Sequence, residues 1–454
     1  MKTVWDILVA LFSLLFSLLV IFLLLTGVLI QPHKKAAHDP VIVVGSGLAG
    51  LTCCLTLLEQ GVSVQLIEKN TSLGGNSRKA SSGVNASLSN RDEVLFAKDT
   101  LKSCGAKTYA TKVDQLTKHS REAIEFLRNH GVTLDQTVML GGHSTARTYR
   151  SQQYMAIGAE IIGQLASQLK QYTTLTITYG TTIVKTDGYS VVDQTGKIHH
   201  GSHIVFATGG FAANAAMIER FAPKFAHLPT TNNSNNVDTL MLLERAGAKL
   251  VDMDKVQIHP TGFIDPLDPT ARTKVLAAGI LRVVGGLLLN DNGERFCDEL
   301  DTRKNIVSKM KEQHGDIFTL VVPSTAMESA GKHIHTYVKK GLLLKSKHAL
   351  FPKHVVFIGK VVPCTHYTMG GVATNEAGRV IDEKGNSILN IFAAGEVTGG
   401  IHGQNRLGGN SLLECVVFGK IVAETIISEI GHKKVVKPTS TRTISYTMKE
   451  VAKT

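Results

Sequence analysis

Two glycine-rich runs in the last quarter of the sequence carry residues that could bind an anion. The first, Thr365–Gly371, contains His366, and the second, Ala393–Ser411, contains Arg406 and Glu396. Glycine at this density is unfavourable within helices and strands, because it loses more conformational entropy than other residues. It does allow backbone to approach a ligand closely. Cationic side chains among such turns indicate a small anionic ligand held beside a flat cofactor.

A second glycine motif lies near the N-terminal end and follows a predicted strand. Val41–Val44 is a β-branched run, and Gly45–Gly50 continues it with the pattern G-x-G-x-x-G. We expect a helix over Leu51–Gln60 and a second strand over Val62–Ile67, closed by Glu68. In such a unit the glycines permit a tight turn and close approach to a pyrophosphate, and the acidic residue accepts a hydrogen bond from a ribose hydroxyl. The sequence therefore predicts a dinucleotide-binding domain.

Three further glycine turns bear on which dinucleotide is bound. They lie in the segments Glu68–Asn76, His203–Gly210 and Asn390–Glu396. Turns that converge on one cofactor favour the long flavin dinucleotide over a nicotinamide dinucleotide. The alternative is that they are unrelated connections between strands and helices.

Composition narrows the class of protein. The chain has 454 residues, of which 43% are hydrophobic and only 6% aromatic, with 42 glycines, and this favours an α/β enzyme over an all-β sandwich. The formal net charge is +12, but the basic residues are scattered and form no stripe interleaved with aromatic residues. We therefore expect anionic ligands and membrane surfaces, and no nucleic acid, as partners. The six cysteines have neither zinc nor haem-attachment spacing, so no metal is predicted.

The N-terminal segment 7–30 is apolar and carries no charged residue. As a helix it would reach about 36 Å, more than the roughly 30 Å of a hydrocarbon core. The apolar part of a secretory signal is shorter, and a mitochondrial transit peptide is rich in arginine. We expect a single-pass transmembrane signal anchor of the endoplasmic reticulum, with a cleaved signal or a mitochondrial location as alternatives. The flanking charges do not orient the helix.

Taken together, residues from Val41 to about Glu429 resemble the FAD-dependent fumarate reductase/succinate dehydrogenase flavoprotein family, and within it the soluble single-chain eukaryotic fumarate reductases. The most specific matches are GGNSRKASSGVNA (Gly74–Ala86), QIHPTG (Gln257–Gly262), NGERFCDELDTR (Asn292–Arg303), HYTMGG (His366–Gly371) and GQNRLGGNS (Gly403–Ser411). Respiratory members of this family carry a histidine that bonds covalently to the flavin, and Asn76 stands at the matching position. The resemblance therefore implies FAD held without a covalent link.

The resemblance also implies a domain organisation. An α/β, Rossmann-like FAD-binding domain of the glutathione-reductase type would cover 41–256 and 367–431, with helices on one side of its sheet and a β-meander on the other. An inserted α+β clamp, or capping, domain would cover 257–366 and exclude water when it closes. The transmembrane helix 7–30 would precede these domains, and a polar, partly disordered tail over 432–454 would follow them.

Residues that contact FAD and substrate are implied in the same way. Those expected at the cofactor are Gly45, Gly47, Leu48, Ala49, Gly50, Glu68, Lys69, Gly75, Asn76, Ser77, Ser82, Gly83, Thr208, Gly209, Gly210, Asp238, Glu396, Ser411 and Leu412. Those expected at the substrate are His259, Thr261, His366, Arg406 and Gly409.

Five of the matched residues are expected to be catalytic. His259 would contact one end of a four-carbon dicarboxylate, and His366 and Arg406 the other. Arg303 would donate a proton to the substrate carbon after hydride arrives from flavin N5, with Arg282 in its proton supply. A guanidinium meets a carboxylate through two parallel hydrogen bonds, and fixed cations stabilise the charge that develops. The resemblance implies reduction of fumarate to succinate, with reduced free flavin or a redox protein as the external electron donor.

Three motifs depart from the family pattern. Gly279 stands where the proton supply usually has a glutamate, Asn236–Thr239 keeps only the aspartate of a T-G-D-G turn, and Arg147–Arg150 replaces R-x-H-R with R-T-Y-R. Two alternatives to fumarate reduction follow. One is a reductase of another α,β-unsaturated acid. The other, motivated by Gly279, is a catalytically weakened flavoprotein that binds FAD and a dicarboxylate.

Overall fold

The computed structural model describes residues 39–105, 109–151, 156–232 and 238–431. From Pro40 onward these residues belong to one compact unit. The predicted transmembrane helix 7–30 and the predicted polar tail 432–454 lie outside the described ranges. Within those ranges, no helix combines the length and apolar character that a membrane span requires.

A six-stranded sheet in the order β19-β20-β10-β1-β2-β6 forms the centre of this unit. Its strands are β1 (Val41–Val44), β2 (Val64–Ile67), β6 (Leu175–Thr178), β10 (His203–Phe206), β19 (Arg379–Ile381) and β20 (Ser387–Ala393). All neighbours pair in parallel except β19 and β20. Val44 lies beside both Ile67 and Phe206, and Phe206 lies beside Ala393. The glycine turns that follow these strands therefore start at the same edge of the sheet.

The first predicted strand is confirmed, whereas the next two elements are displaced. Helix α2 (Leu48–Glu59) begins three residues before the predicted start, inside the glycine motif, with Gly47 as its N-cap. A side-chain carbon at Gly50 would lie 2.0 Å from the carbonyl oxygen of Gly45, so only glycine lets the helix start this close to the turn. Strand β2 begins at Val64 because Gly61, with φ of +76°, turns the chain first.

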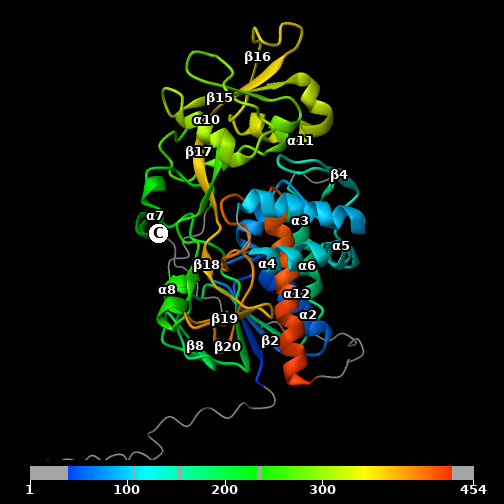
Figure 1. Cartoon of the computed structure of the whole chain (residues 1–454), viewed down its shortest axis with the longest axis vertical. Coiled ribbons are helices and arrows are strands. Elements are labelled where there is room, and N and C mark those ends of the chain that lie inside the picture. The colour runs from blue at the N-terminus through cyan, green and yellow to red at the C-terminus, as the bar shows by residue number, and fades with distance from the viewer. Residues whose placement is uncertain (1–38, 106–108, 152–155, 233–237, 432–454) are drawn as a thin grey trace, which may run out of the picture. The chain divides into compact units, whose positions relative to one another are not determined.

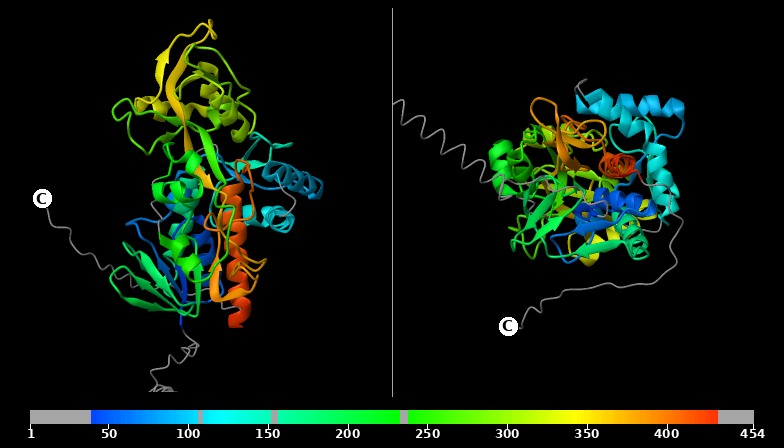
Figure 2. Two further views of the ribbon diagram at one scale, coloured as in Figure 1. Left: turned by 60° about the vertical axis from the view of Figure 1, so that its left-hand side comes forward. Right: turned by 90° about the horizontal axis from the view of Figure 1, so that it is seen from below.

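Helices cover one side of the central sheet. Helix α12 (Asn410–Ile430) and helix α6 (Ile157–Leu169) pack on α2, burying Leu51, Leu55 and Val416 completely. An antiparallel three-stranded sheet lies on the other side of the central strands, as Figures 1 and 2 show, and corresponds to the predicted meander. Its strands are β7 (Ile183–Thr186), β8 (Ser190–Asp193) and β9 (Ile198–His200). The result is a mixed α/β fold.

Residues 257–366, here called the clamp, contribute most of a second six-stranded sheet. Its strands are β12 (Val256–Phe263), β13 (Val275–Leu276), β14 (Leu287–Leu289), β15 (Phe318–Pro323), β16 (Leu344–Ser346) and β17 (Val356–Thr368). Figure 1 shows β15 and β16 gathered with α10 (Arg303–Lys311) and α11 (Met327–Lys339) at one end of the unit. The paired strands β12 and β17 connect this end to the part built on the central sheet, and two register shifts interrupt their pairing around His259.

The remaining described elements surround these sheets. They are α3 (Asn90–Cys104), α4 (Ala110–Lys118), α5 (Ser120–Asn129), α7 (Ala215–Phe221), α8 (Asp238–Arg245), α9 (Ile280–Val283), the 3-10 helices η1 (Gly75–Lys79), η3 (Pro223–Phe225) and η4 (Ser324–Ala326), and the strands β3 (Val84–Asn85), β4 (Gln136–Val138), β5 (Thr148–Arg150), β11 (Leu250–Val251) and β18 (Gly371–Val372).

Candidate active site

A cavity of about 630 Å³ brings the separated glycine turns together with the clamp. The predicted residues that line it are Gly45, Gly47, Leu48, Ala49, Glu68, Lys69, Gly75, Asn76, Ser77, Ser82, Gly83, Thr208, Gly209, Arg303, His366, Glu396, Arg406, Gly409, Ser411 and Leu412. The predicted residues that do not line it are Gly50, Gly210, His259, Thr261 and Arg282. Asp238 begins helix α8, but its side chain is outside the description.

At one end of the cavity the predicted ribose acid, Glu68, is held in place by protein donors. Its Oε2 accepts hydrogen bonds from the backbone N–H of Ser46 at 2.9 Å and from the Ser46 hydroxyl at 2.5 Å. Its Oε1 accepts the backbone N–H of Asn70 at 2.8 Å. The Asn70 side-chain amide donates to the same oxygen at 2.8 Å, so these four hydrogen bonds use the roughly four acceptor sites of a carboxylate. A ligand hydroxyl would therefore replace or share one of them, and the Asn70 amide is the donor that a side-chain rotation removes.

Two further features show that this end fits an extended cofactor. The Ser77 hydroxyl accepts the N–H of Leu48 at 3.1 Å, which fixes the start of α2 against the cavity. The hydroxyl oxygen of Thr208 is buried and has no hydrogen-bond partner among the described residues, although it lines the cavity. A buried hydroxyl without a partner is unfavourable, so we expect a polar group of a bound ligand to form a hydrogen bond with the Thr208 hydroxyl.

The two predicted glycines outside the cavity are required by packing. A side-chain carbon at Gly210 would lie 2.1 Å from the Thr368 hydroxyl and 2.3 Å from Oε1 of Glu396. At Gly50 the obstacle is the turn at Gly45, as described above. Both glycines shape the wall of the cavity from behind.

Glu396, which belongs to the second glycine run, lies in the cavity wall. It accepts the backbone N–H of Thr368 at 2.9 Å. Burial raises the pKa of Glu396 to about 7, despite this hydrogen bond. The carboxyl group therefore exchanges its proton near neutral pH.

Sequence reasoning missed a buried group next to Glu396. The Tyr367 hydroxyl donates a hydrogen bond to Oε1 of Glu414 at 2.6 Å, and His402 contacts the other oxygen of the same carboxylate. Tyr367 itself lines the cavity, and the Arg406 guanidinium lies 4.3 Å from the centre of its ring. The adjacency of Tyr367 to His366 was the one signal in the sequence, because Glu414 is flanked by apolar residues near the start of α12.

At the other end of the cavity two arginines approach from different parts of the chain. Arg303 is the first residue of α10, whose N-cap Thr302 accepts the N–H of Asn305. Arg406 is positioned by its backbone N–H, which donates to Oε1 of Gln257 at 2.8 Å. Nη1 of Arg303 and Nε of Arg406 are buried and find no acceptor among the described residues. Buried cationic donors without acceptors are costly, so this end is suited to an anion.

The two predicted histidines form an edge-to-face pair, with ring centres 5.2 Å apart. The N–H of Thr261 donates to Nδ1 of His259 at 3.2 Å, which places the proton of a neutral His259 on Nε2. Desolvation, reinforced by Arg303, holds the pKa of both rings well below the usual range. Both histidines are therefore neutral at pH 7, and the positive charge at this end comes from the arginines. His259 lies behind His366 and does not line the cavity.

Arg282 faces a second, smaller cavity of about 40 Å³, which Arg303 and Arg406 also line. Its guanidinium donates to the backbone carbonyl of Glu299 at 2.8 Å. Burial lowers the pKa of Arg282 to about 10. A side-chain carbon added at Gly279 would meet only Nη2 of Arg282, at 3.7 Å, so the place of the expected glutamate is open space.

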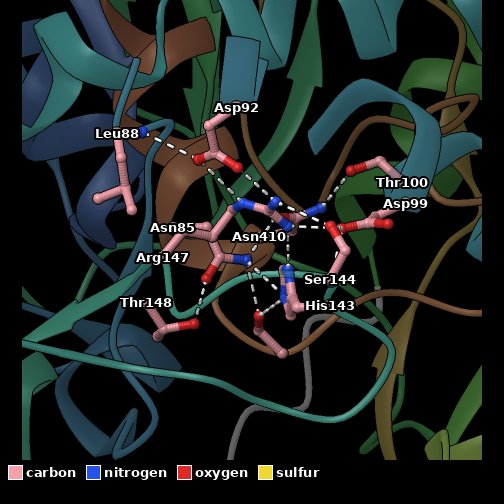
Figure 3. A network of polar contacts seen from close by, with 11 residues as sticks. Asn85, Leu88, Asp92, Asp99, Thr100, His143, Ser144, Arg147, Thr148 and Asn410 are labelled. Carbon is pink, nitrogen blue, oxygen red and sulfur yellow. Dashed lines mark hydrogen bonds and ion pairs between the residues drawn. The ribbon is translucent and has the colours of Figure 1, made fainter. Parts of the chain in front are cut away.

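A buried polar network, which sequence reasoning also missed, positions the loop after Arg406 (Figure 3). The side-chain amide of Asn85 donates to the carbonyl of Gly408 and to Oδ1 of Asn410, both at 2.7 Å. A side-chain carbon at Gly409 would lie 2.2 Å from Oδ1 of Asn85, so glycine lets the loop pack directly on this amide.

The network continues to Arg147, which is fully buried. Arg147 forms ion pairs with Asp92 and Asp99, each at 2.6 Å, and contacts Nδ1 of His143 at 3.1 Å. Nε2 of His143 lies 3.2 Å from the Gly408 carbonyl, which closes the connection to the loop. The first arginine of the R-T-Y-R motif therefore supports the loop from behind and does not line the cavity.

Comparison with known proteins identifies relatives of this chain. The model of the family described as "FAD binding domain" matches residues 40–412. Fumarate reductase 1 of Saccharomyces cerevisiae is 36% identical, with 86% of this chain and 99% of the relative covered. Fumarate reductase of Schizosaccharomyces pombe is 34% identical, with 90% and 93% covered. A solved structure of the open conformation of a flavocytochrome c3 fumarate reductase is similar with a TM-score of 0.74 and 27% identity, covering 86% of this chain and 78% of that one.

Proposed function

This chain belongs to the FAD binding domain family, and from that premise we propose that it is an FAD-dependent fumarate reductase, which reduces fumarate to succinate. The observation that carries the proposal is the pair of unpaired guanidinium nitrogens, on Arg303 and Arg406, in the cavity that the FAD-binding turns also line. A four-carbon dianion supplies the acceptors that these two arginines lack.

In this proposal FAD occupies the long cavity and supplies the hydride. Glu68 and the N-terminus of α2 hold its dinucleotide part. Asn76 lines the cavity where a covalent link would require a histidine, so FAD is bound non-covalently. Acid precipitation of the purified protein should then release the flavin into the supernatant, and a yellow pellet would contradict this.

The groups that would bind the substrate differ in charge, because Arg406 is cationic and His366 is neutral. Arg406 pairs with one carboxylate through its guanidinium, beside the neutral His366, whose Nδ1 is engaged by the Thr231 hydroxyl at 2.8 Å. Its Nε2 is then free to donate or accept. His259 holds the His366 ring from behind at the edge-to-face distance. Hydride addition pushes negative charge toward a carboxylate, and the fixed arginines stabilise it without reorganisation.

Arg303 is the proposed proton donor to the substrate carbon. An isolated arginine is a very weak acid, because its pKa exceeds about 12. Here desolvation, together with the charges of Arg406 and Arg282, holds the pKa of Arg303 well below that value. The structure thus supplies a physical reason why this guanidinium can give up a proton.

Electrons for the next turnover would come from an external donor, either reduced free flavin or a redox protein. The test of function uses FAD-loaded enzyme that has been photoreduced under anaerobic conditions. Mixing it with fumarate should restore the visible flavin absorbance at roughly ten per second or faster. Crotonate, a monocarboxylate of similar length, should reoxidise it far more slowly.

The absence of a carboxylate at Gly279 favours one second candidate, a weakened flavoprotein that binds FAD and dicarboxylate with little turnover. In that case fumarate would bind and perturb the flavin spectrum, yet the flavin would stay bleached for minutes. Fast reoxidation by crotonate instead would support a reductase of other unsaturated acids.

A further inference from the structure

Three arginines line the small cavity beside Gly279, and each carries a buried nitrogen without a partner among the described residues. The nitrogens are Nε of Arg282, Nη1 of Arg303 and Nε of Arg406, and none has a hydrogen-bond partner among the described residues. All three side chains line the cavity of about 40 Å³. Like charges in a poorly solvated space repel strongly, so the arginine cluster is unfavourable unless a negative charge compensates it.

The substrate cavity cannot supply that charge to all three arginines. Arg303 and Arg406 line both cavities, whereas Arg282 lines only the small one. Arg282 is 8% exposed, and its side chain makes one described hydrogen bond, to the Glu299 carbonyl. Because Arg282 lines the small cavity, an anion bound there can contact its guanidinium.

The two acidic residues in the wall of the small cavity are engaged elsewhere. The Glu299 carboxylate accepts the N–H of Leu288 at 2.9 Å and pairs with Arg295 at 2.7 Å. The Asp301 carboxylate is exposed and accepts from the N–H of Thr302 and from the Asn305 amide. After these pairings the three arginines outnumber the available negative charges.

Size limits what can occupy the cavity. Roughly 10–15 Å³ of such space is enough for one water molecule, so 40 Å³ suits a group of two or three heavy atoms. Gly279 adds to this space, because a side-chain carbon there would have one neighbour, Nη2 of Arg282, within 4 Å. A planar carboxylate can take two parallel hydrogen bonds from a guanidinium.

We propose that the small cavity lined by Gly279, Arg282, Arg303 and Arg406 is a binding site for a small monovalent anion, either a halide or a carboxylate of the size of formate. The bound anion accepts a hydrogen bond from Arg282 and neutralises part of the arginine cluster. This site adjoins the substrate cavity, with which it shares Arg303 and Arg406, but its existence does not depend on the proposed reaction.

The test measures thermal unfolding of the FAD-loaded protein while sodium formate or sodium chloride is added, with saturating succinate present throughout to occupy the substrate cavity. A bound anion should raise the melting temperature by about 1–2 °C at ten times its dissociation constant, and the rise should then grow with the logarithm of the anion concentration. Sodium sulfate at matched ionic strength is the comparison salt. Its ion is too large for the cavity, so the general stabilisation that it gives by exclusion from the surface should be the same in the wild type and in the variants below.

Variants assign the effect to the site. Gly279 has φ of −57° and ψ of −24°, which any residue adopts, so Gly279→Glu can place a tethered carboxylate beside Arg282. This variant should lose the response to formate. Gly163→Glu is the matched control, since Gly163 is an exposed helical glycine with nothing within 4 Å of an added side-chain carbon, and it should respond like the wild type.

Arg282→Gln is the second variant, and it removes the cation while leaving Gly279 unchanged. It too should lose the response, so the site can be tested even if Gly279→Glu folds poorly. The proposal is overturned if both variants keep the wild-type response to formate. It is also overturned if the response is seen only when succinate is left out, since that result would place the anion in the substrate cavity. If the protein fails to reduce fumarate but responds to formate as described, only the proposed function fails.

Discussion

The two ends of the large cavity differ in how their polar groups are satisfied. At the dinucleotide end the Thr208 hydroxyl lacks a partner, but the protein itself satisfies the charged group: Ser46 and Asn70 donate four hydrogen bonds to the Glu68 carboxylate. At the substrate end, Arg303 and Arg406 keep buried nitrogens without acceptors among the described residues. The first end is therefore preorganised by internal hydrogen bonds. The second is completed only by an anion, and this contrast predicts that changes at the two ends separate cofactor binding from turnover.

The largest effect is expected for Arg303→Gln. Removing the proposed proton donor should lower the rate of flavin reoxidation by fumarate by about 10³-fold or more, because both general acid catalysis and charge stabilisation are lost. The FAD content should stay at the wild-type level. Lys304→Gln, a neighbouring exposed lysine whose amine contacts Gln404, is the control for loss of one positive charge. If the variant keeps a tenth of the wild-type rate, Arg303 is not the proton donor.

A smaller loss is expected for Arg406→Gln. The substrate carboxylate would lose its two-point contact, at a cost of about 3 kcal/mol, which corresponds to roughly 100-fold in kcat/KM. Steady-state kinetics with fumarate measure this change, and Arg220→Gln at an exposed ion pair serves as control. An unchanged kcat/KM would place the carboxylate elsewhere in the cavity.

The opposite pattern is expected for Glu68→Gln. The uncharged amide is a weaker acceptor for Ser46, so the affinity for FAD should fall by roughly 10-fold or more, from a loss of about 1.5–3 kcal/mol for hydrogen bonds to a charged group. The molecules that do contain FAD should be reoxidised by fumarate at the wild-type rate. Flavin fluorescence titration gives the affinity, with the exposed Glu125→Gln as control. Equal losses of affinity and of the rate per bound flavin would contradict the separation of the two ends.

The smallest effect concerns pH and Glu396, which lies between the two ends. Burial raises its pKa from 4.5 to about 7 in the folded protein, so the folded state binds a proton that the unfolded state releases. The stability this contributes is fully present below about pH 4.5 and is lost as the pH rises to about 7. Glu396→Gln should therefore show a smaller decline in the free energy of unfolding over this window, measured by denaturant titration without FAD. Parallel curves for the two proteins would show that Glu396 does not titrate there.

Much of the dinucleotide end could be predicted from sequence, because its geometry follows from local rules. A buried strand followed by G-x-G-x-x-G places a helix N-terminus at the sheet edge, and the register Val44 to Phe206 to Ala393 then aligns the later turns. The predicted start of α2, three residues too late, was also wrong for a local reason. The motif itself forms the first turn of the helix, which Gly50 permits.

The supports of the substrate end could not be predicted in this way. Asn85 reaches the carbonyl of Gly408, more than 300 residues away, and nothing near either residue in the sequence indicates the contact. His259 lies beside a register shift between β12 and β17, which Pro260 and Gly262 in the sequence indicate. They do not indicate that the His259 ring lies behind His366. Resemblance to a family identified the arginines, whereas the network around Arg147 required coordinates.

The pairing of β12 with β17 has a mechanical consequence. His259 and His366 lie on these adjoining strands, and α10, which begins with Arg303, packs on β12. Arg406 instead precedes α12, whose long axis is fixed against α2. A rocking movement of the clamp would carry three of the four groups as one rigid set. Such a movement would change the distance between the guanidinium groups of Arg303 and Arg406. The affinity of the two arginines for a dicarboxylate would change with that distance.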